Sequence, residues 1–88
     1  MELRDLRKEI DDIDDELVKL FCRRMEVAER VAAYKQEKGL PVLDASREET
    51  KLQDVMKMAG PEMEEYVLHL YKTLFEVSRA HQKNKMNG

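Results

Sequence analysis

Helix-breaking residues, aromatic residues and cysteine are all scarce in this sequence. Its 88 residues include three Gly, two Pro, no Trp and only 6% aromatic side chains. The single cysteine, Cys22, excludes an internal disulfide. No apolar run is long enough for a signal peptide or a membrane-spanning segment, so we expect a soluble, cytoplasmic protein. The net charge of −3 argues against a general binder of nucleic acid or membranes.

Residue sets that carry covalent or metal-dependent catalysis are also missing. With two His and two Ser, the sequence holds no evident Cys–His or Ser–His–Asp set. It has neither metal ligands at the usual spacings nor a Gly-rich phosphate loop. An enzyme built from this sequence would have to act by positioning its substrate and by electrostatic stabilisation.

The residues that are present favour helices. Charged residues make up 40% and apolar residues 42% of the chain, and Glu, Lys, Leu, Met and Arg are good helix formers. So much charge would also suit a disordered chain, but the apolar residues recur at regular steps, which argues against disorder. We therefore predict one all-α domain over residues 1–88, with a modest core.

The first predicted helix covers about residues 3–38, a stretch with neither Gly nor Pro. Its apolar seam advances by alternating steps of four and three residues and has one charged interruption. Gly39 is a stop signal, and Pro41 prevents the helix from resuming. The seam consists of Leu6, Ile10, Ile13, Leu17, Leu20, Arg24, Val27, Val31 and Tyr34.

Two further helices are predicted, at about residues 45–59 and 61–83. Asp44 and Ser46 are both suitable N-caps for the second helix, and Ser46 has capping-box spacing to Glu49. Gly60 and Pro61 separate the helices, and the polar tail from residue 83 is expected to fray. The apolar face of the second helix carries Glu48, Leu52, Val55 and Ala59, and the stripe of the third carries Met63, Val67, Leu70, Leu74, Val77 and His81.

The length of the first helix predicts a dimer. About 36 residues at a rise of roughly 1.5 Å extend about 54 Å, whereas a compact domain of 88 residues has a radius of gyration near 12 Å. The other two helices are together about as long as the first, so they cannot cover both its faces. A second copy of the chain, related by a two-fold axis, is the simplest way to bury the remainder.

Polar residues interrupt the apolar faces, and such positions are candidates for function. Arg24 lies in the seam of the first helix and shares a face with Lys35, about 16 Å further along the axis. Ser78 and Gln82 are one turn apart on the third helix, on a face with Tyr71 and Phe75. The candidate set is Arg7, Arg24, Lys35, Glu48, Ser78 and Gln82, with Arg7 beside the seam.

Each of these residues also has a structural explanation. Arg24 alone would serve as a register device or would extend its charged head to water, and Lys35 alone would complement the dipole at a helix C-terminus. His81 on an apolar stripe is more typical of a packed core histidine than of a ligand. Taken together, however, the inward cations exceed what Glu48 can neutralise, and unpaired buried charge is costly. A ligand with two carboxylates would balance them.

Five motifs follow one another along the chain. They are Leu6-Arg7-x-x-Ile10-x-x-Ile13-Asp14, Leu20-x-x-Arg23-Arg24, Val31-x-x-Tyr34-Lys35, Gly39-Leu40-Pro41-Val42-x-Asp44-x-x-Arg47-Glu48 and Ser78-x-x-x-Gln82. Single pieces are unspecific, but the ordered set, from Leu3 to Gln82, closely resembles the all-α (AroQ) class of chorismate mutases. The resemblance implies an intertwined homodimer of three-helix chains. It also implies conversion of chorismate, a dianion, to prephenate on the route to phenylalanine and tyrosine, with no cofactor and no metal.

The resemblance further implies roles for the matching residues at the two ends of the substrate. Arg24 and Lys35 of one chain, with Arg7 of the partner subunit, would hold the two carboxylates. Lys35 and Gln82 would hydrogen-bond the ether oxygen, which gains negative charge as the C–O bond breaks.

Four more residues receive roles by the same resemblance. Glu48 would accept a hydrogen bond from the ring hydroxyl, helped by the backbone at Asp44. Ser78 would assist at a carboxylate, and Arg47 would line or brace the pocket. Because the amide of Gln82 donates at any ordinary pH, no special acid optimum is expected.

Two other functions stay open at this point. One is a lyase on the same scaffold, which splits isochorismate into salicylate and pyruvate in a pocket lined by similar cations. Glu48, as the acceptor for a ring hydroxyl, favours the mutase. A non-catalytic helical dimerisation module would not need the inward Arg, Lys, Glu and Gln together. The sequence also leaves open whether the chain is a free-standing enzyme or one module of a longer protein.

Overall fold

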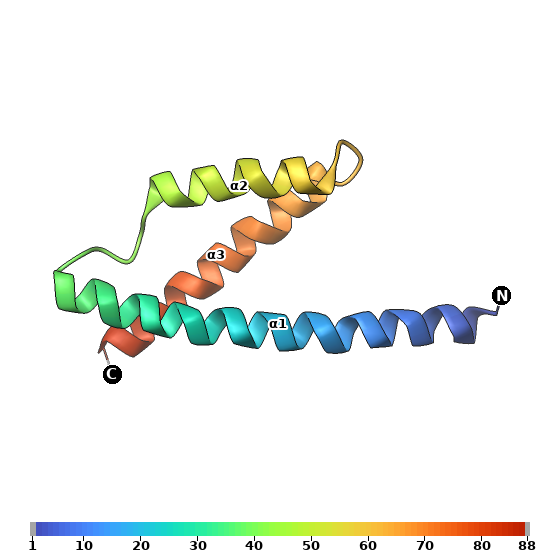
Figure 1. Cartoon of the computed structure of the whole chain (residues 1–88), viewed down its shortest axis with the longest axis horizontal. Coiled ribbons are helices and arrows are strands. Elements are labelled where there is room, and N and C mark those ends of the chain that lie inside the picture. The colour runs from blue at the N-terminus through green and yellow to red at the C-terminus, as the bar shows by residue number, and fades with distance from the viewer. Residues whose placement is uncertain (1, 88) are drawn as a thin grey trace.

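The computed structural model describes residues 2–87 and contains three α-helices. Helix α1 spans Leu3–Lys38, α2 spans Ala45–Ala59 and α3 spans Glu64–Asn87. The described residues contain no strand, so the predicted all-α class is confirmed. Figure 1 shows α1 and α2 on opposite sides, with α3 crossing from the end of α2 to the C-terminal part of α1.

The first connection begins and ends with local signals that the sequence predicts. Gly39 closes α1 with a φ of +69°, a left-handed conformation that glycine adopts without steric cost. At the start of α2, the Asp44 side chain accepts a hydrogen bond from the backbone N–H of Arg47 at 3.0 Å. Of the two predicted N-caps, Asp44 is therefore correct and Ser46 is wrong, since Ser46 lies within the first turn.

Helix α3 begins later than the predicted residue 61. Residues 61–63 form a turn in which the N–H of Met63 donates to the carbonyl oxygen of Gly60 at 3.1 Å. Gly60 has a φ of +85°, and the helical hydrogen bonds start only after this turn.

Helix α3 also continues to Asn87, so the prediction that the chain frays from residue 83 is wrong for residues 83–87. Residue 88 lies outside the described residues. Contacts with α1 explain the extra turn. The side-chain amide of Gln36 donates to the carbonyl oxygen of Met86 at 3.2 Å, and Lys85 lies 3.6 Å from the carboxylate of Glu29.

The core of one chain is small and lies where α3 meets the other two helices. Helix α3 packs against both α1 and α2, whereas α1 and α2 do not pack against each other within residues 2–87. Small side chains on α1 allow α3 to approach closely, and Ala32 is only 1% exposed. The buried apolar residues are Ala28, Ala32, Leu52, Val55 and Phe75.

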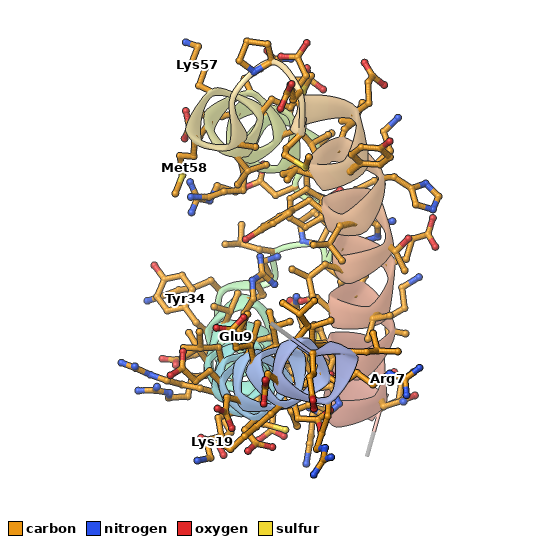
Figure 2. The ribbon with its side chains drawn as sticks, turned by 90° about the vertical axis from the view of Figure 1, so that its right-hand side faces the viewer. Arg7, Glu9, Lys19, Tyr34, Lys57 and Met58 are labelled. Atoms are coloured by element: carbon orange, nitrogen blue, oxygen red, sulfur yellow. The ribbon has the colours of Figure 1, made fainter. Side chains whose placement is uncertain are left out.

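The N-terminal half of α1 extends beyond the other helices (Figure 1). All of residues 2–23 are exposed, and the molecule is 55 Å long. Its radius of gyration is 16.1 Å, against about 12 Å for a compact domain of this length. Figure 2 views the molecule from this projecting end, where Arg7 lies.

The apolar seam of α1 is exposed in both halves of the helix, because α3 contacts a different face. Leu17 in the N-terminal half is 56% exposed and Tyr34 near the C-terminal end is 57% exposed. Part of the predicted apolar stripe of α3, at Met63, Leu70 and Val77, is exposed as well. Monomeric proteins rarely expose so much contiguous apolar surface. The chain thus offers two apolar surfaces to the predicted second copy, and the homodimer stays a prediction.

None of the described helices is both long and apolar enough to cross a membrane. The cytoplasmic location stays a prediction.

Candidate active site

A cavity of about 300 Å³ lies between the three helices. Helix α1 and the connection to α2 line one side of it, the first turns of α2 line another, and the C-terminal half of α3 completes it. Seven of the eight predicted site residues line this cavity, namely Arg24, Lys35, Asp44, Arg47, Glu48, Ser78 and Gln82. Arg7, the eighth, lies on the projecting half of α1 and does not line the cavity of its own chain.

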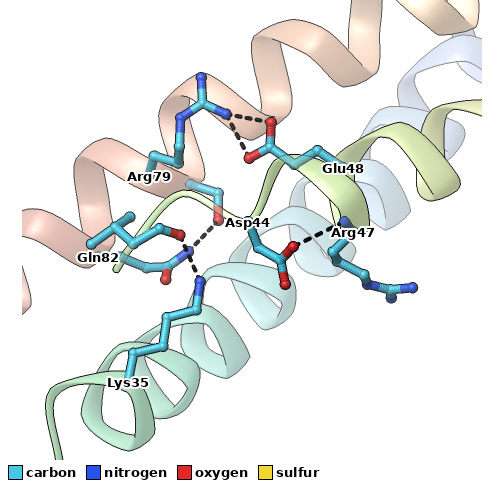
Figure 3. Close-up of polar contacts among 8 residues, drawn as sticks. Lys35, Asp44, Arg47, Glu48, Arg79 and Gln82 are labelled. Atoms are coloured by element: carbon cyan, nitrogen blue, oxygen red, sulfur yellow. Dashed lines mark hydrogen bonds and ion pairs between the residues drawn. The ribbon is translucent and has the colours of Figure 1, made fainter. Parts of the chain in front are cut away.

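Two cations reach the cavity from α1. Arg24 places its guanidinium 5.8 Å from the ring centroid of Phe75 on α3, within the range of a cation–π contact. Lys35 donates from Nζ to the carbonyl oxygen of Val42 at 2.6 Å and so connects α1 to the loop before α2 (Figure 3). An ammonium carries three donors, so Lys35 keeps two for a ligand.

The start of α2 holds Asp44 and Glu48 in place through backbone hydrogen bonds. The side chain of Asp44 caps the helix at the N–H of Arg47, and its carbonyl oxygen accepts from the N–H of Glu48 at 3.0 Å. These bonds fix the first turn, so the direction of the Glu48 side chain follows from the cap.

The carboxylate of Glu48 contacts a cation that the sequence analysis missed. Arg79 on α3 donates from Nη1 to both carboxylate oxygens, at 2.5 and 2.6 Å (Figure 3). Both side chains are about one quarter exposed, at 27% for Arg79 and 24% for Glu48. Lys51, which also lines the cavity, was missed too. A sequence signal existed for both, because Lys51 is three residues after Glu48 and Arg79 directly follows Ser78, yet neither interrupts an apolar stripe.

Ser78 and Gln82 are buried polar residues one turn apart on α3. Each is 7% exposed, and Nε2 of Gln82 lies 3.3 Å from the hydroxyl oxygen of Ser78. The other amide atom, Oε1 of Gln82, has no hydrogen-bond partner among the described residues. Buried polar atoms are normally paired, so an amide left partly unpaired at a cavity suits a site that a polar ligand completes.

The cavity is strongly positive although the whole chain is negative. Its lining includes five cations, on Arg24, Lys35, Arg47, Lys51 and Arg79, and two carboxylates, on Asp44 and Glu48, for a net charge of +3. The chain as a whole carries −3. Charge of one sign lining a concave site concentrates the field there and attracts ligands of the opposite sign.

A second polar cluster lies outside the cavity, where α3 crosses α1. Nε2 of His81 is 2.8 Å from Oε1 of Glu29, and Lys85 is near the same oxygen. The hydrogen bond from His81 lowers the pKa of Glu29, burial opposes this shift, and the charge of Lys85 lowers the pKa further. His81 therefore hydrogen-bonds to Glu29 at the edge of the α1–α3 contact, and its predicted place in a packed core is wrong.

The fold and the cavity define a small all-α protein with a binding site suited to an anion. Residues 6–83 match the protein family described as chorismate mutase type II, and the chain belongs to this family. The resemblance drawn from the motifs is thereby confirmed.

Relatives of the chain include one protein of similar length and two much longer proteins. The chorismate mutase of Methanocaldococcus jannaschii is 31% identical over 83 residues, which cover 92% of this chain and 84% of that protein. The bifunctional chorismate mutase/prephenate dehydratase of Aquifex aeolicus is 29% identical over 87 residues, or 93% of this chain and 24% of that protein. The T-protein of Haemophilus influenzae is 45% identical over 51 residues, or 58% of this chain and 14% of that protein. The chain therefore spans about a quarter or less of the length of the last two relatives. No solved structure matches it.

Proposed function

We propose that this chain is a chorismate mutase, which rearranges chorismate to prephenate. The strongest support is that seven predicted residues, from all three helices and one loop, line one cavity whose net charge is +3. Chorismate is a dianion of a size that such a cavity accommodates. Membership of the chorismate mutase type II family supports the same reaction.

The proposed chemistry needs no proton transfer and no covalent intermediate. Within one substrate molecule the ether C–O bond breaks while a C–C bond forms. Arg24 and Lys35 bind the carboxylates and hold the flexible substrate in its folded, reactive conformation, which removes an orientational barrier. Ser78 assists at a carboxylate, and Arg47 lines the pocket beside the first turn of α2.

Two side chains stabilise the charge that develops on the ether oxygen. Lys35 has donors beyond the one that Val42 accepts, and Gln82 has a second N–H beyond the one directed at Ser78. Donors fixed on this oxygen act more strongly in the transition state than in the ground state, and one such donor is worth about 3–4 kcal/mol. Glu48 accepts a hydrogen bond from the ring hydroxyl and thereby sets the orientation of the ring.

We further propose that two copies of the chain share their α1 helices, so that Arg7 of the partner subunit completes each site. The projecting half of α1 and its exposed seam support this arrangement, because a second copy would bury both. Arg7 is at the end of α1 that extends away from the cavity of its own chain. A residue that contributes to the cavity of a second copy would have to be at this end.

The experiment that tests the proposed reaction follows the loss of chorismate absorbance and identifies the product. We expect prephenate from the wild-type chain and a rate at least about a hundredfold lower from Lys35→Ala, the effect of removing one transition-state donor. Lys38→Ala, which removes a neighbouring cation outside the cavity lining, is the matched control and should keep the wild-type rate. Salicylate and pyruvate from isochorismate would instead identify the lyase, and no turnover of either substrate would leave a binding module.

A further inference from the structure

Arg79 and Glu48 form a pair across the cavity lining whose geometry is asymmetric. One guanidinium nitrogen, Nη1, serves both carboxylate oxygens, at 2.5 and 2.6 Å, in place of the two-nitrogen fork usual for this pair. Each carboxylate oxygen can accept about two hydrogen bonds, so one acceptor position on each stays free. The pair joins α3 to the first turn of α2, and both residues line the cavity (Figure 3).

We infer that Arg79 is a positioning residue that acts on the substrate through Glu48. This inference rests on the proposed function, in which Glu48 accepts the ring hydroxyl. Arg79 holds the carboxylate in one orientation with acceptor positions still free, and it neutralises a negative charge that would otherwise face a dianion. In this scheme Arg79 directs Nη1 to Glu48 and does not bind the substrate carboxylates itself.

Charge repulsion gives the expected effect of removing Arg79. Without its cation, the carboxylate of Glu48 lies unpaired in the cavity and repels the substrate in the ground state and in the transition state alike. A change that affects both states equally raises KM and leaves kcat nearly unchanged. Replacing Glu48 by Gln as well removes the charge that repels, and the cavity then returns to a net charge of +3.

The test is a double-mutant cycle on the full chain, with kcat and KM for chorismate measured at low salt. For Arg79→Met we expect KM to rise about tenfold, equivalent to about 1.4 kcal/mol, with kcat within about threefold of wild type. Glu48→Gln lowers activity by itself, and adding Arg79→Met to it should change kcat/KM by less than about twofold. Arg79→Lys keeps the charge and should recover most of the loss. Lys57→Met, which removes a cation from the far end of α2, should match wild type (Figure 2).

Each other outcome overturns the inference in a recognisable way. Losses that multiply in the double variant would show that Arg79 contacts the substrate independently of Glu48. Equal losses in Arg79→Met and Arg79→Lys, accompanied by a fall in melting temperature, would show a role in folding alone. If the wild-type chain does not convert chorismate, the proposed function fails. The same four variants are then compared by calorimetry for their affinity for a bicyclic transition-state mimic. Absence of that binding as well would overturn the role of Arg79.

Discussion

The two halves of α1 belong to one continuous helix and share one apolar seam, yet their surroundings differ completely. The C-terminal half carries Ala28 and Ala32, which are buried, and Arg24 and Lys35, which line the cavity. The N-terminal half projects beyond α2 and α3, and all its residues are exposed (Figure 1). Small residues allow the C-terminal half to pack within its own chain, whereas the large apolar residues of the N-terminal half stay exposed. The contacts within one chain and the exposed surface that the proposed second copy would cover therefore lie on different stretches and faces of the same helix.

The largest expected effect tests whether the two halves of α1 serve different sites. Arg7→Ala and Lys35→Ala homodimers should each lose at least about a hundredfold in kcat/KM, because each removes a charge that the substrate needs. When the two variants are mixed and their subunits exchange, one site of each heterodimer receives both damaged residues and the other receives none. Activity should then rise toward half that of wild type per heterodimer. If exchange is verified by differently tagged chains and activity does not return, Arg7 does not act across an interface.

The next effect concerns the seam of the projecting half. Leu17→Asp places a carboxylate where the proposed second copy packs, and burying an unpaired charge costs several kcal/mol. We expect the dimer to dissociate and activity to fall with it, measured by light scattering after size exclusion. Lys19, labelled in Figure 2, is two residues and therefore about 200° further round α1, so Lys19→Asp introduces the same acid away from Leu17 and should leave the dimer intact. Dissociation in both variants, or in neither, would contradict a seam-centred interface.

A smaller effect is expected in the half that packs within its own chain. Ala32 is 1% exposed, and Ala32→Leu forces extra carbon atoms between α1 and α3 at a cost of about 1–3 kcal/mol. The free energy of unfolding from urea titration should fall by this amount. Ala33→Leu makes the same change at the neighbouring exposed position and should be nearly neutral. Equal stability of the two variants would show that the contact between α1 and α3 tolerates larger side chains.

Features set by local signals are predicted by the sequence alone, whereas features set by packing between helices are not. The bounds of α1 and α2 follow from local signals, such as the left-handed Gly39 and the cap at Asp44. Five of the residues that line the cavity, Arg24, Lys35, Glu48, Ser78 and Gln82, were predicted because they interrupt or share inward helix faces. Asp44 and Arg47 were predicted as site residues only through the family resemblance. On α3, however, hydrophobicity favours the stripe through Leu70 and Val77 as the core, while the chain itself buries the face that contains Phe75.

The features that the sequence did not predict depend on how helices cross. Arg79 is recognisable as a partner of Glu48 only once α3 is placed against the first turn of α2. The late start of α3 at Glu64 and its extension to Asn87 likewise depend on the turn after Gly60 and on contacts with α1. The position of Arg79 directly after Ser78 indicates the cavity but not the pairing with Glu48, and both this pairing and the bounds of α3 are tertiary effects.

The smallest expected effect concerns the point where α3 crosses the C-terminal half of α1. His81 and then Lys85 lower the pKa of Glu29, so the native state holds this carboxylate ionised more firmly than the unfolded chain does. The unfolded chain therefore binds the proton more readily, and the pair contributes stability that is complete above the ordinary value of 4.5 and is lost as the pH falls through the lower native pKa. We expect melting temperatures to fall less between pH 6 and pH 3 for Glu29→Gln than for wild type. Glu26→Gln, at an exposed position on the same helix, should retain the wild-type dependence. Identical curves for Glu29→Gln and wild type would mean that the cluster does not hold α3 on α1, and the extra turn of α3 would then depend on Gln36 alone.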